Sequence, residues 1–246
     1  NIAEAFKVVS PHQSLEDITI TAILPNMNVT VPADSVETAK MTEHILLKVV
    51  GPCCIRFARE ATPIISKPET PFIYGLANII RFRKESEKFI DAFETVPSDK
   101  YASENEDATI IACGPEVPEA MRAAYILKKE HDIEARVLNV HTVKPLDDLA
   151  LAKAAAETGA LVIAEEHQRG GFGNIVAGAL ANSDRLEGRH YLVRMMGMPD
   201  AFGESGQPWE LIWKYGLAAE HIVDKVLELV KLRQKLKSGN VWSGIC

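Results

Sequence analysis

From residue 107 onward, the sequence alternates between short apolar runs and longer stretches with apolar residues at helical spacing. The run "ATIIACG" is typical of a strand that ends in a glycine turn, "VPEAMRAAYILKKEH" of a helix, and "EARVLNV" of a second strand. The alternation continues to "RHYLVRMMG", after which two helices close the pattern. Strands that alternate with helices predict a parallel sheet with crossover helices. We therefore expect residues 108–236 to form one doubly wound α/β domain.

A shorter pattern of the same kind occupies residues 1–60. The β-branched runs "FKVVS" and "NVTVPA" predict strands, and "SVETAKMTEHILLKVV" has the apolar spacing of a helix. The segment "GPCCIRFARE" then predicts a buried strand after a Gly-Pro turn. The predicted fold class is therefore α/β, with two doubly wound, mostly parallel-sheet domains.

Between these two regions, the alternation of predicted strands and helices becomes irregular. The stretch "REATPIISKPETPF" contains three prolines, and the residues from 81 to 107 are rich in charge. We therefore expect residues 61–107 to be a solvated linker, with at most one surface helix. Residues 237–246 are expected to be a tail.

Composition restricts the partners of this chain. A formal net charge of -7 argues against non-specific nucleic-acid binding, which requires a basic face. An anionic small substrate is still compatible, because a few local arginines can capture phosphate on an acidic protein. No apolar run approaches the roughly 18 residues that span a bilayer, and the start does not have the pattern of a signal peptide. Because the first residue is Asn, a removed targeting segment stays an open alternative.

The four cysteines are Cys53, Cys54, Cys113 and Cys246, and their spacing contains no CxxC motif or other metal-ligand pattern. Three of them lie in predicted strands and one in the tail. We interpret them as small buried hydrophobes and a tail thiol, with no metal site. Free thiols of this kind favour a reducing cytoplasm.

The most polar strand-to-helix loop is "EEHQRGGFG", residues 165–173. Open α/β sheets bind ligands beyond the carboxyl ends of their strands, and glycines at a helix start can present N–H groups to an anion. Alternatively, the glycines permit a tight turn while Glu165 and Glu166 satisfy nearby backbone. The loop lacks the GxGxxG fingerprint of dinucleotide sites, so we favour the second interpretation.

Two parts of the sequence together resemble one family. The segments "HQSLEDITITAILPNMNVTVPADSVET" and "GPCCIRFARE" are similar to the second half of the pyrimidine-binding domain of transketolases. The segments "DATIIACGPEVPEAMRAAYILKKEHDIEARVLNVHTVKPLD", "EEHQRGGFGN" and "PDAFGESGQPWELIWKYGLAAEHI" resemble the transketolase C-terminal domain. The resemblance implies that residues 1–60 are only part of a pyrimidine-binding domain, so the first domain is incomplete, and that residues 108–236 are the C-terminal domain.

This resemblance implies thiamine diphosphate chemistry with Mg²⁺ or Ca²⁺. In such enzymes a two-carbon ketol unit moves between sugar phosphates, in a site formed between two chains, and the protein positions the sugar and moves protons. The segments that hold the cofactor in the family do not match this chain. Both the cofactor and the cation are therefore expected to be bound mainly by missing segments or by an N-terminal, diphosphate-binding partner subunit, in a homodimer or heterotetramer.

The resemblance also implies three site residues. His12 matches a histidine that contacts the substrate near the cofactor, so we expect a catalytic and substrate-binding role, because imidazole can hydrogen-bond a sugar hydroxyl or carbonyl. Arg59 matches the arginine that grips the substrate phosphate. Arg56, on the same predicted strand, is a weaker substrate-binding candidate. Without the resemblance, His12 would be a turn residue, and Arg59 would pair with Asp34 or Glu37.

The resemblance implies no role in the chemistry for two other histidines. The family's C-terminal domain stays away from the chemistry, so His141 and His167 are expected to be structural. The family also has a glycine-rich acidic loop where Ser10 here precedes Pro11 directly. We expect that residues are missing between Ser10 and Pro11, and before Asn1; the alternative is that this protein has deleted the loop.

The leading hypothesis is the C-terminal subunit of a split transketolase, acting with a partner on sugar phosphates in the pentose phosphate pathway of the cytoplasm. One alternative is a related enzyme, 1-deoxyxylulose-5-phosphate synthase or the beta subunit of a 2-oxo-acid dehydrogenase. The segment "FGESGQPWELIWKYGL" favours transketolase over both. Another alternative is a non-catalytic assembly module.

Overall fold

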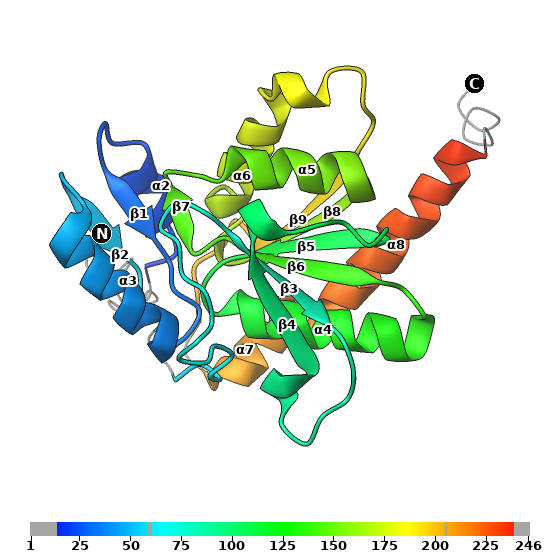
Figure 1. Ribbon diagram of the computed structural model, residues 1–246, viewed down its shortest axis with the longest axis horizontal. Coiled ribbons are helices and arrows are strands. Elements are labelled where there is room, and N and C mark those ends of the chain that lie inside the picture. The colour runs from blue at the N-terminus through cyan, green and yellow to red at the C-terminus, as the bar shows by residue number, and fades with distance from the viewer. Residues whose placement is uncertain (1–13, 59–60, 205, 239–246) are drawn as a thin grey trace.

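The computed structural model describes residues 14–58, 61–204 and 206–238, and these residues build one large and one small β-sheet (Figure 1). The large sheet has six strands in the order β4-β3-β6-β5-β8-β9. Its parallel strands are β5 (Ala108–Ala112), β6 (Ala135–Asn139), β8 (Ala160–Gln168) and β9 (Leu192–Met198). This confirms the α/β fold with a mostly parallel sheet.

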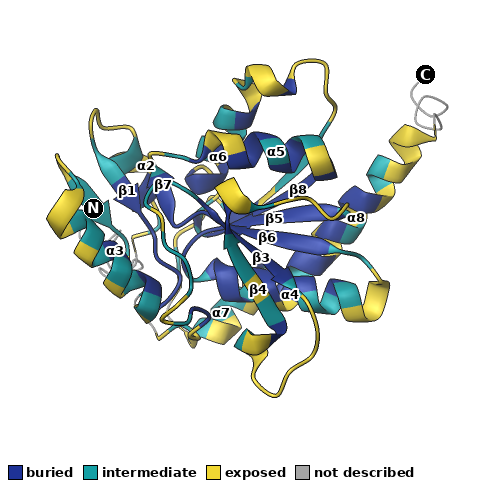
Figure 2. Cartoon of the chain, viewed as in Figure 1, coloured by how far each residue is buried: buried dark blue, intermediate teal, exposed yellow. Residues whose placement is uncertain are grey.

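Helices cover both faces of the large sheet. Successive strand residues point to opposite faces, so Ile110 packs into one apolar cluster and Ile111 into another. The first cluster contains α4 (Glu116–His131) and α8 (Ala219–Lys237), and the second contains α5 (Asp148–Thr158) and α6 (Phe172–Ala181). The strands between them are the most buried part of the molecule (Figure 2). The sheet is therefore doubly wound, as the alternating pattern predicts. A shorter helix, α7 (Pro208–Lys214), precedes α8.

The small sheet has three strands in the order β2-β1-β7. The strand β1 (Asn28–Thr30) is parallel to β2 (Cys53–Ile55) and antiparallel to β7 (Thr142–Lys144). The helices beside this sheet are α2 (Asp17–Ala22) and α3 (Ser35–Lys48). Because β7 comes from the later part of the chain, the two sequence regions share this sheet and are not separate in space.

The predicted linker at residues 61–107 is wrong over two stretches. Residues Asn78–Phe82 form β3 and residues Phe93–Pro97 form β4, and β3 pairs antiparallel with both β4 and β6. Four of the five residues of β3 are buried. These strands lie in a charge-rich sequence, which is typical of a solvated connector. In the fold, however, Arg81 is buried and its charge is paired with that of Glu106.

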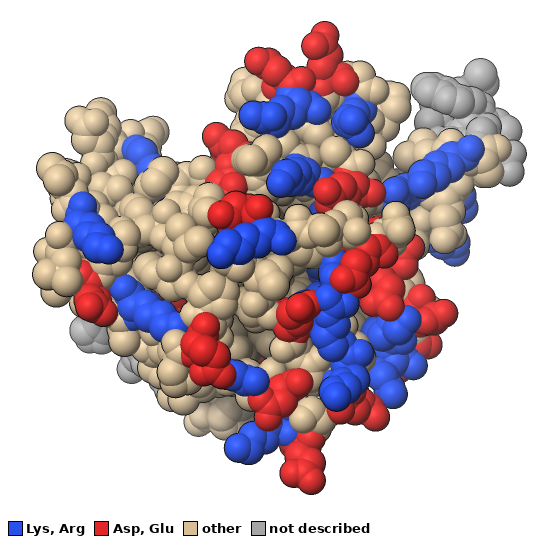
Figure 3. All heavy atoms as spheres, in the orientation of Figure 1, with Lys and Arg blue, Asp and Glu red and all other residues tan. Residues whose placement is uncertain are grey.

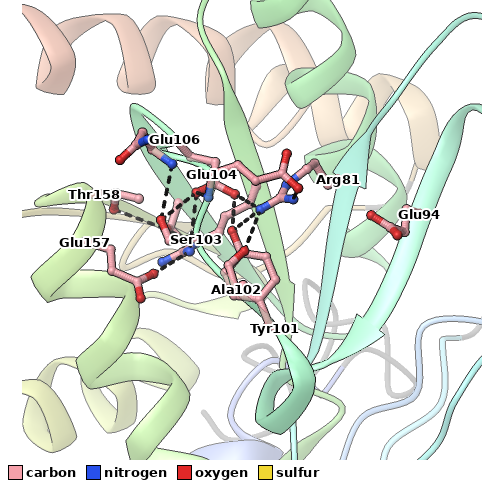
Figure 4. Close-up of polar contacts among 12 residues, drawn as sticks. Arg81, Glu94, Tyr101, Ala102, Ser103, Glu104, Glu106, Glu157 and Thr158 are labelled. Carbon is pink, nitrogen blue, oxygen red and sulfur yellow. Dashed lines mark hydrogen bonds and ion pairs between the residues drawn. The ribbon is translucent and has the colours of Figure 1, made fainter.

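The pairing of Arg81 is part of a buried network beside the large sheet (Figure 4). Arg81 and Tyr101 both bond the carboxylate of Glu106, and Arg136 lies 3.6 Å from its other oxygen. Both guanidinium groups stack on the Tyr101 ring at 4.8 Å. Burial raises the pKa of Glu106, but the hydrogen bond from Tyr101 and the arginine charges outweigh it and lower the pKa to about 2. This network fixes the segment that leads into β5.

Candidate functional site

Two of the three predicted site residues, His12 and Arg59, lie outside the described residues. The third, Arg56, directly follows β2 at the boundary between the small and the large sheet. Its side chain is only 11% exposed. The geometry near the predicted site is therefore built around Arg56 and the groups that surround it.

The guanidinium of Arg56 is held by two segments, residues 14–17 and the end of β8. Its Nε donates to Asp17 Oδ1 at 3.1 Å, on the first residue of α2. Its Nη2 donates to the Glu166 carbonyl at 3.1 Å and to the Ser14 carbonyl at 3.4 Å, and Nη1 lies 3.6 Å from Glu166 Oε2. These partners occupy the N–H donors of the Arg56 guanidinium that would otherwise bind a substrate phosphate.

A buried histidine continues this cluster. Ile18 N–H donates to both Asp17 Oδ1 at 2.9 Å and His167 Nε2 at 3.2 Å. His167 Nε2 also lies 3.4 Å from Asp17 Oδ1, and the ring is completely buried at the end of β8. The sequence predicts a structural role for His167, and the structure places it beside α2, in the contact between the two sheets.

The glycine-rich loop after β8 is occupied by its own carboxylate. Glu165 accepts hydrogen bonds from Phe172 N at 2.7 Å and Gly173 N at 2.8 Å, which caps the start of α6. A Cβ at Gly171 would fall on Nδ1 of His167, far inside van der Waals contact. The interpretation of this loop as a tight turn with backbone-bonded carboxylate is therefore confirmed for Glu165, and the helix start is not open to an anion.

The charges in this cluster shift its acid groups in different directions. Partial burial raises the pKa of Asp17, but the nearby His167 and the charge of Arg56 lower it more, so the net pKa falls. Burial raises the pKa of Glu166 more than the charge of Arg56 lowers it. The distances show the same order, since Arg56 Nε hydrogen-bonds Asp17 at 3.1 Å whereas Nη1 lies 3.6 Å from the Glu166 carboxylate.

Sequence reasoning missed a buried acid beside this cluster. Glu116 begins α4, is 0% exposed, and neither of its carboxyl oxygens has a hydrogen-bond partner among the described residues. Burial, with the nearby charges of Glu166, Glu119 and Glu165, raises its pKa well above the ordinary value. Glu116 follows Gly114 and Pro115, and this turn signal could have placed it at a helix start but not inside the fold.

His141 is also part of the core. It is completely buried, its ring lies 4.8 Å from the Phe72 ring, and Nδ1 lies 2.9 Å from Thr142 Oγ1. Burial lowers its pKa to about 4, against the opposing charge of Asp147. A histidine that stays neutral in an aromatic contact is suited to packing, as the sequence predicts.

A surface groove of about 640 Å³ lies next to the cluster. One wall comes from the chain just before α2, and the others come from the ends of β8 and β9. Arg169 is the cation among the lining residues, and it shares the lining with the two acids Glu16 and Asp200. The remaining lining residues are Gln168, Gly170, Met198, Ala201 and Phe202.

The described residues do not fit thiamine diphosphate or its cation. No group of three or more His, Cys, Asp or Glu side chains among them is arranged to hold a metal ion. Helix starts that could take a diphosphate already carry carboxylates, since Asp34 caps α3, Asp147 caps α5 and Glu165 caps α6. These three helix starts are therefore occupied, and the described His, Cys, Asp and Glu side chains supply no metal site.

Comparisons with known proteins agree with the domain order read from the sequence. The family model for the transketolase pyrimidine binding domain matches residues 8–64, and the model for the transketolase C-terminal domain matches residues 100–222. An apulose-4-phosphate transketolase subunit of Phocaeicola vulgatus is 33% identical over 222 residues, which are 89% of this chain and 62% of that protein.

Two further relatives are similar in the same way. A 6-deoxy-6-sulfo-D-fructose transketolase subunit of a Clostridium species is 34% identical over 89% of this chain and 60% of its own length. The solved structure of a split gene transketolase, described as an inactive beta4 tetramer, has a TM-score of 0.72 and 34% identity, covering 90% of this chain and 63% of that chain. The chain thus spans about three fifths of the length of these relatives, and it belongs to the transketolase family.

Proposed function

We propose that this chain is the C-terminal subunit of a split transketolase, which moves a two-carbon ketol unit between sugar phosphates. The observation that carries the proposal is the order of the two matched family domains, in a chain similar to proteins named as transketolase subunits. In the family, thiamine diphosphate supplies the carbanion chemistry of this transfer. Because the described residues do not fit that group, we assign it and its Mg²⁺ or Ca²⁺ ion to a partner subunit or to further segments.

His12 and Arg59 are the proposed substrate-binding residues, on the basis of the family motif. His12 would hydrogen-bond a sugar hydroxyl or carbonyl and exchange a proton there. Arg59 would bind the phosphate, because its planar fork can donate two parallel hydrogen bonds to it. Arg56 is a weaker candidate for direct substrate binding, since Asp17 and Glu166 already engage its guanidinium.

The proposed partner is an N-terminal, diphosphate-binding subunit, in a homodimer of such pairs or a heterotetramer. An exposed apolar surface around α2 and α3 supports the need for a partner. The side chains of this surface include Ile23 at 80% exposure, Leu46 at 78% and Val50 at 94%. On the face that Figure 3 shows, charged side chains are sparser over this part than over the large-sheet part. Exposed apolar side chains that gather on one part of a surface often mark contacts with another chain.

The proposed location is the cytoplasm, and the pentose phosphate pathway is the proposed setting. The three described cysteines are free thiols, which supports a reducing compartment. In the described part of the chain, no helix combines the length and apolarity that crossing a membrane requires.

The test is reconstitution. The purified chain would be mixed with the diphosphate-binding subunit of the same organism, thiamine diphosphate and Mg²⁺, and ketol transfer from xylulose 5-phosphate to ribose 5-phosphate would be measured. We expect transfer by the pair, none by either chain alone, and loss of transfer in His12→Ala but not in the surface variant Arg122→Gln. A loaded pair without ketol transfer would overturn the proposal.

The same reconstituted pair separates the alternatives. Decarboxylation of pyruvate in place of ketol transfer would indicate 1-deoxyxylulose-5-phosphate synthase or a 2-oxo-acid dehydrogenase beta subunit. A pair that assembles but acts on none of these substrates would indicate a non-catalytic assembly module.

A further inference from the structure

Arg56 and Asp17 lie next to the two proposed substrate-binding residues along the chain. Arg56 precedes Arg59 by three residues, and Asp17 follows His12 by five. The hydrogen bond of 3.1 Å from Arg56 Nε to Asp17 Oδ1 therefore joins the segment that leads to Arg59 with the segment that follows His12. These segments are 39 residues apart in sequence, so no local structure links them.

The same guanidinium attaches both segments to the large sheet. Arg56 Nη2 donates to the Glu166 carbonyl at 3.1 Å, and Nη1 lies 3.6 Å from the Glu166 carboxylate. Glu166 belongs to β8, which has nine residues and pairs with β5 and β9 up to Ala164; the pairing with β9 resumes at Gln168, so Glu166 lies two residues beyond the regular ladders. Arg56 thus attaches to a strand that is anchored in the large sheet nearby, whereas β2, which leads into Arg56, has only three residues.

Further contacts hold the segment after His12 against the same strand. Gln168 N–H donates to the Leu15 carbonyl at 3.0 Å, and Ile18 N–H donates to His167 Nε2 at 3.2 Å. Both Gln168 and His167 belong to β8. The chain from residue 15 to residue 18 is thus fixed by β8 on one side and by Arg56 on the other.

We infer that Arg56, Asp17 and Glu166 form a positioning node that fixes the described segments next to His12 and Arg59 against each other and against β8. The inference rests on the proposed function, and it gives the C-terminal domain a part in phosphate recognition through Glu166, which is not one of the proposed substrate-binding residues. Arg56 suits this role because its planar guanidinium presents donors in fixed, separate directions to two segments, whereas the ammonium group of a lysine is a compact point charge on a flexible stem. Small errors in the position of a binding group are costly, since a 1 Å displacement can reduce rate by about 100-fold.

The test compares a phosphorylated with an unphosphorylated acceptor in the reconstituted pair. The kcat/KM for ribose 5-phosphate would be divided by that for D-ribose in the wild-type chain and in Arg56→Gln, Arg56→Lys and Glu166→Gln. Arg83→Gln is the matched control, because Arg83 also follows a strand of the described fold and bridges two carboxylates, Glu94 and Glu104.

A loss of positioning has a distinct kinetic signature. We expect the ratio to fall about tenfold or more in Arg56→Gln, mainly through a higher KM for the phosphorylated sugar, and by less in Arg56→Lys and Glu166→Gln. The control Arg83→Gln should leave the ratio unchanged. If kcat/KM falls equally for both acceptors, or does not fall, the positioning role is wrong.

A second measurement does not depend on activity. Hydrogen exchange of the isolated chain should become faster at residues 15–19 in Arg56→Gln and stay unchanged there in Arg83→Gln. Unchanged exchange at residues 15–19 in Arg56→Gln would overturn the node itself. If exchange changes as expected but the wild-type pair shows no ketol transfer, the proposed function has failed and the link between the two segments stands.

Discussion

Glu37 makes the stability of this chain depend on pH near neutrality. The residue lies in the first turn of α3 and is 4% exposed. Its Oε2 accepts a hydrogen bond from Ala33 N at 2.7 Å, and its Oε1 accepts one from Asn139 Nδ2 at 2.9 Å. Burial, together with the charge of Asp34, raises the pKa of Glu37 from 4.5 to about 7.

The sign and size of the change in stability follow from the difference between the pKa of Glu37 in the folded and in the unfolded chain. Below pH 4.5, Glu37 is protonated in both the folded and the unfolded chain, so its ionisation does not change the free energy of unfolding. Between 4.5 and about 7, only the unfolded chain releases the proton, and the free energy of unfolding falls as pH rises. Since one pKa unit corresponds to about 1.4 kcal/mol, the full loss is about 3 kcal/mol, and it is complete above pH 7.

The variant Glu37→Gln removes the titration and keeps the contacts. The carbonyl of the new side-chain amide can accept from Ala33 N, and its NH₂ group can donate to Asn139 Oδ1, which is buried without a hydrogen-bond partner in the described wild-type structure. Only a flip of the Asn139 amide is needed. Glu43→Gln is the control, because Glu43 is an exposed acid on the same helix.

Urea unfolding at several pH values between 4.5 and 8.5 measures the effect. We expect the stability of Glu37→Gln relative to wild type to increase with pH by about 3 kcal/mol and to level off above pH 7. The control should show no such trend. A stability difference between Glu37→Gln and wild type that is the same at every pH would refute the reasoning.

Three further substitutions test the packing described above. Glu106→Gln leaves two buried arginines without their shared carboxylate, so it should lower the free energy of unfolding by about 3–5 kcal/mol. The control Glu104→Gln changes an exposed acid and should alter the free energy of unfolding little. Equal effects of the two substitutions would contradict the network. Glu116→Leu removes a buried carboxyl group that has no hydrogen-bond partner among the described residues, so it should raise the free energy of unfolding measured in urea by about 1–3 kcal/mol; a decrease would show that this carboxyl group has a partner. Gly171→Ala should destabilise the chain by about 1–3 kcal/mol in thermal unfolding, because the new methyl group would collide with His167. Gly178→Ala, in the helix that follows, places its methyl group in open space and should not destabilise the chain. A larger loss of stability in Gly178→Ala than in Gly171→Ala would refute the packing at this turn.

The sequence predicts most of the large sheet and little of its antiparallel edge. Runs such as residues 108–112 are recognisable because every residue is apolar or β-branched, and such strands are buried on both faces. The strand β3 contains Arg81 and lies among charged residues, so its pattern resembles that of a connector. Its partner Glu106 is 25 residues away, and a pairing at that distance is not visible in local periodicity.

The predicted substrate-binding residues come from the family motif alone, and His12 and Arg59 stay predictions. Composition and spacing alone would leave His12 as a turn residue and Arg59 as half of an ion pair. The same motif could not show that Arg56 faces Asp17 and Glu166, because that contact depends on how the two sheets meet. Glu116 was missed for a related reason, since a glutamate in the first turn of a helix is usually exposed to solvent.

The position of β7 has a consequence for how this chain can fold during synthesis. The strand β1 is complete at residue 30, but one of its two neighbours is not made until residue 144. A connection of this length is slow to close, and four strands of the large sheet, β3 to β6, lie between β1 and β7 in the sequence. The small sheet can therefore be finished only after β5 and β6 exist. A truncation between the two matched family domains would leave β1 with an open edge, so these two regions should be inherited, expressed and exchanged as one unit.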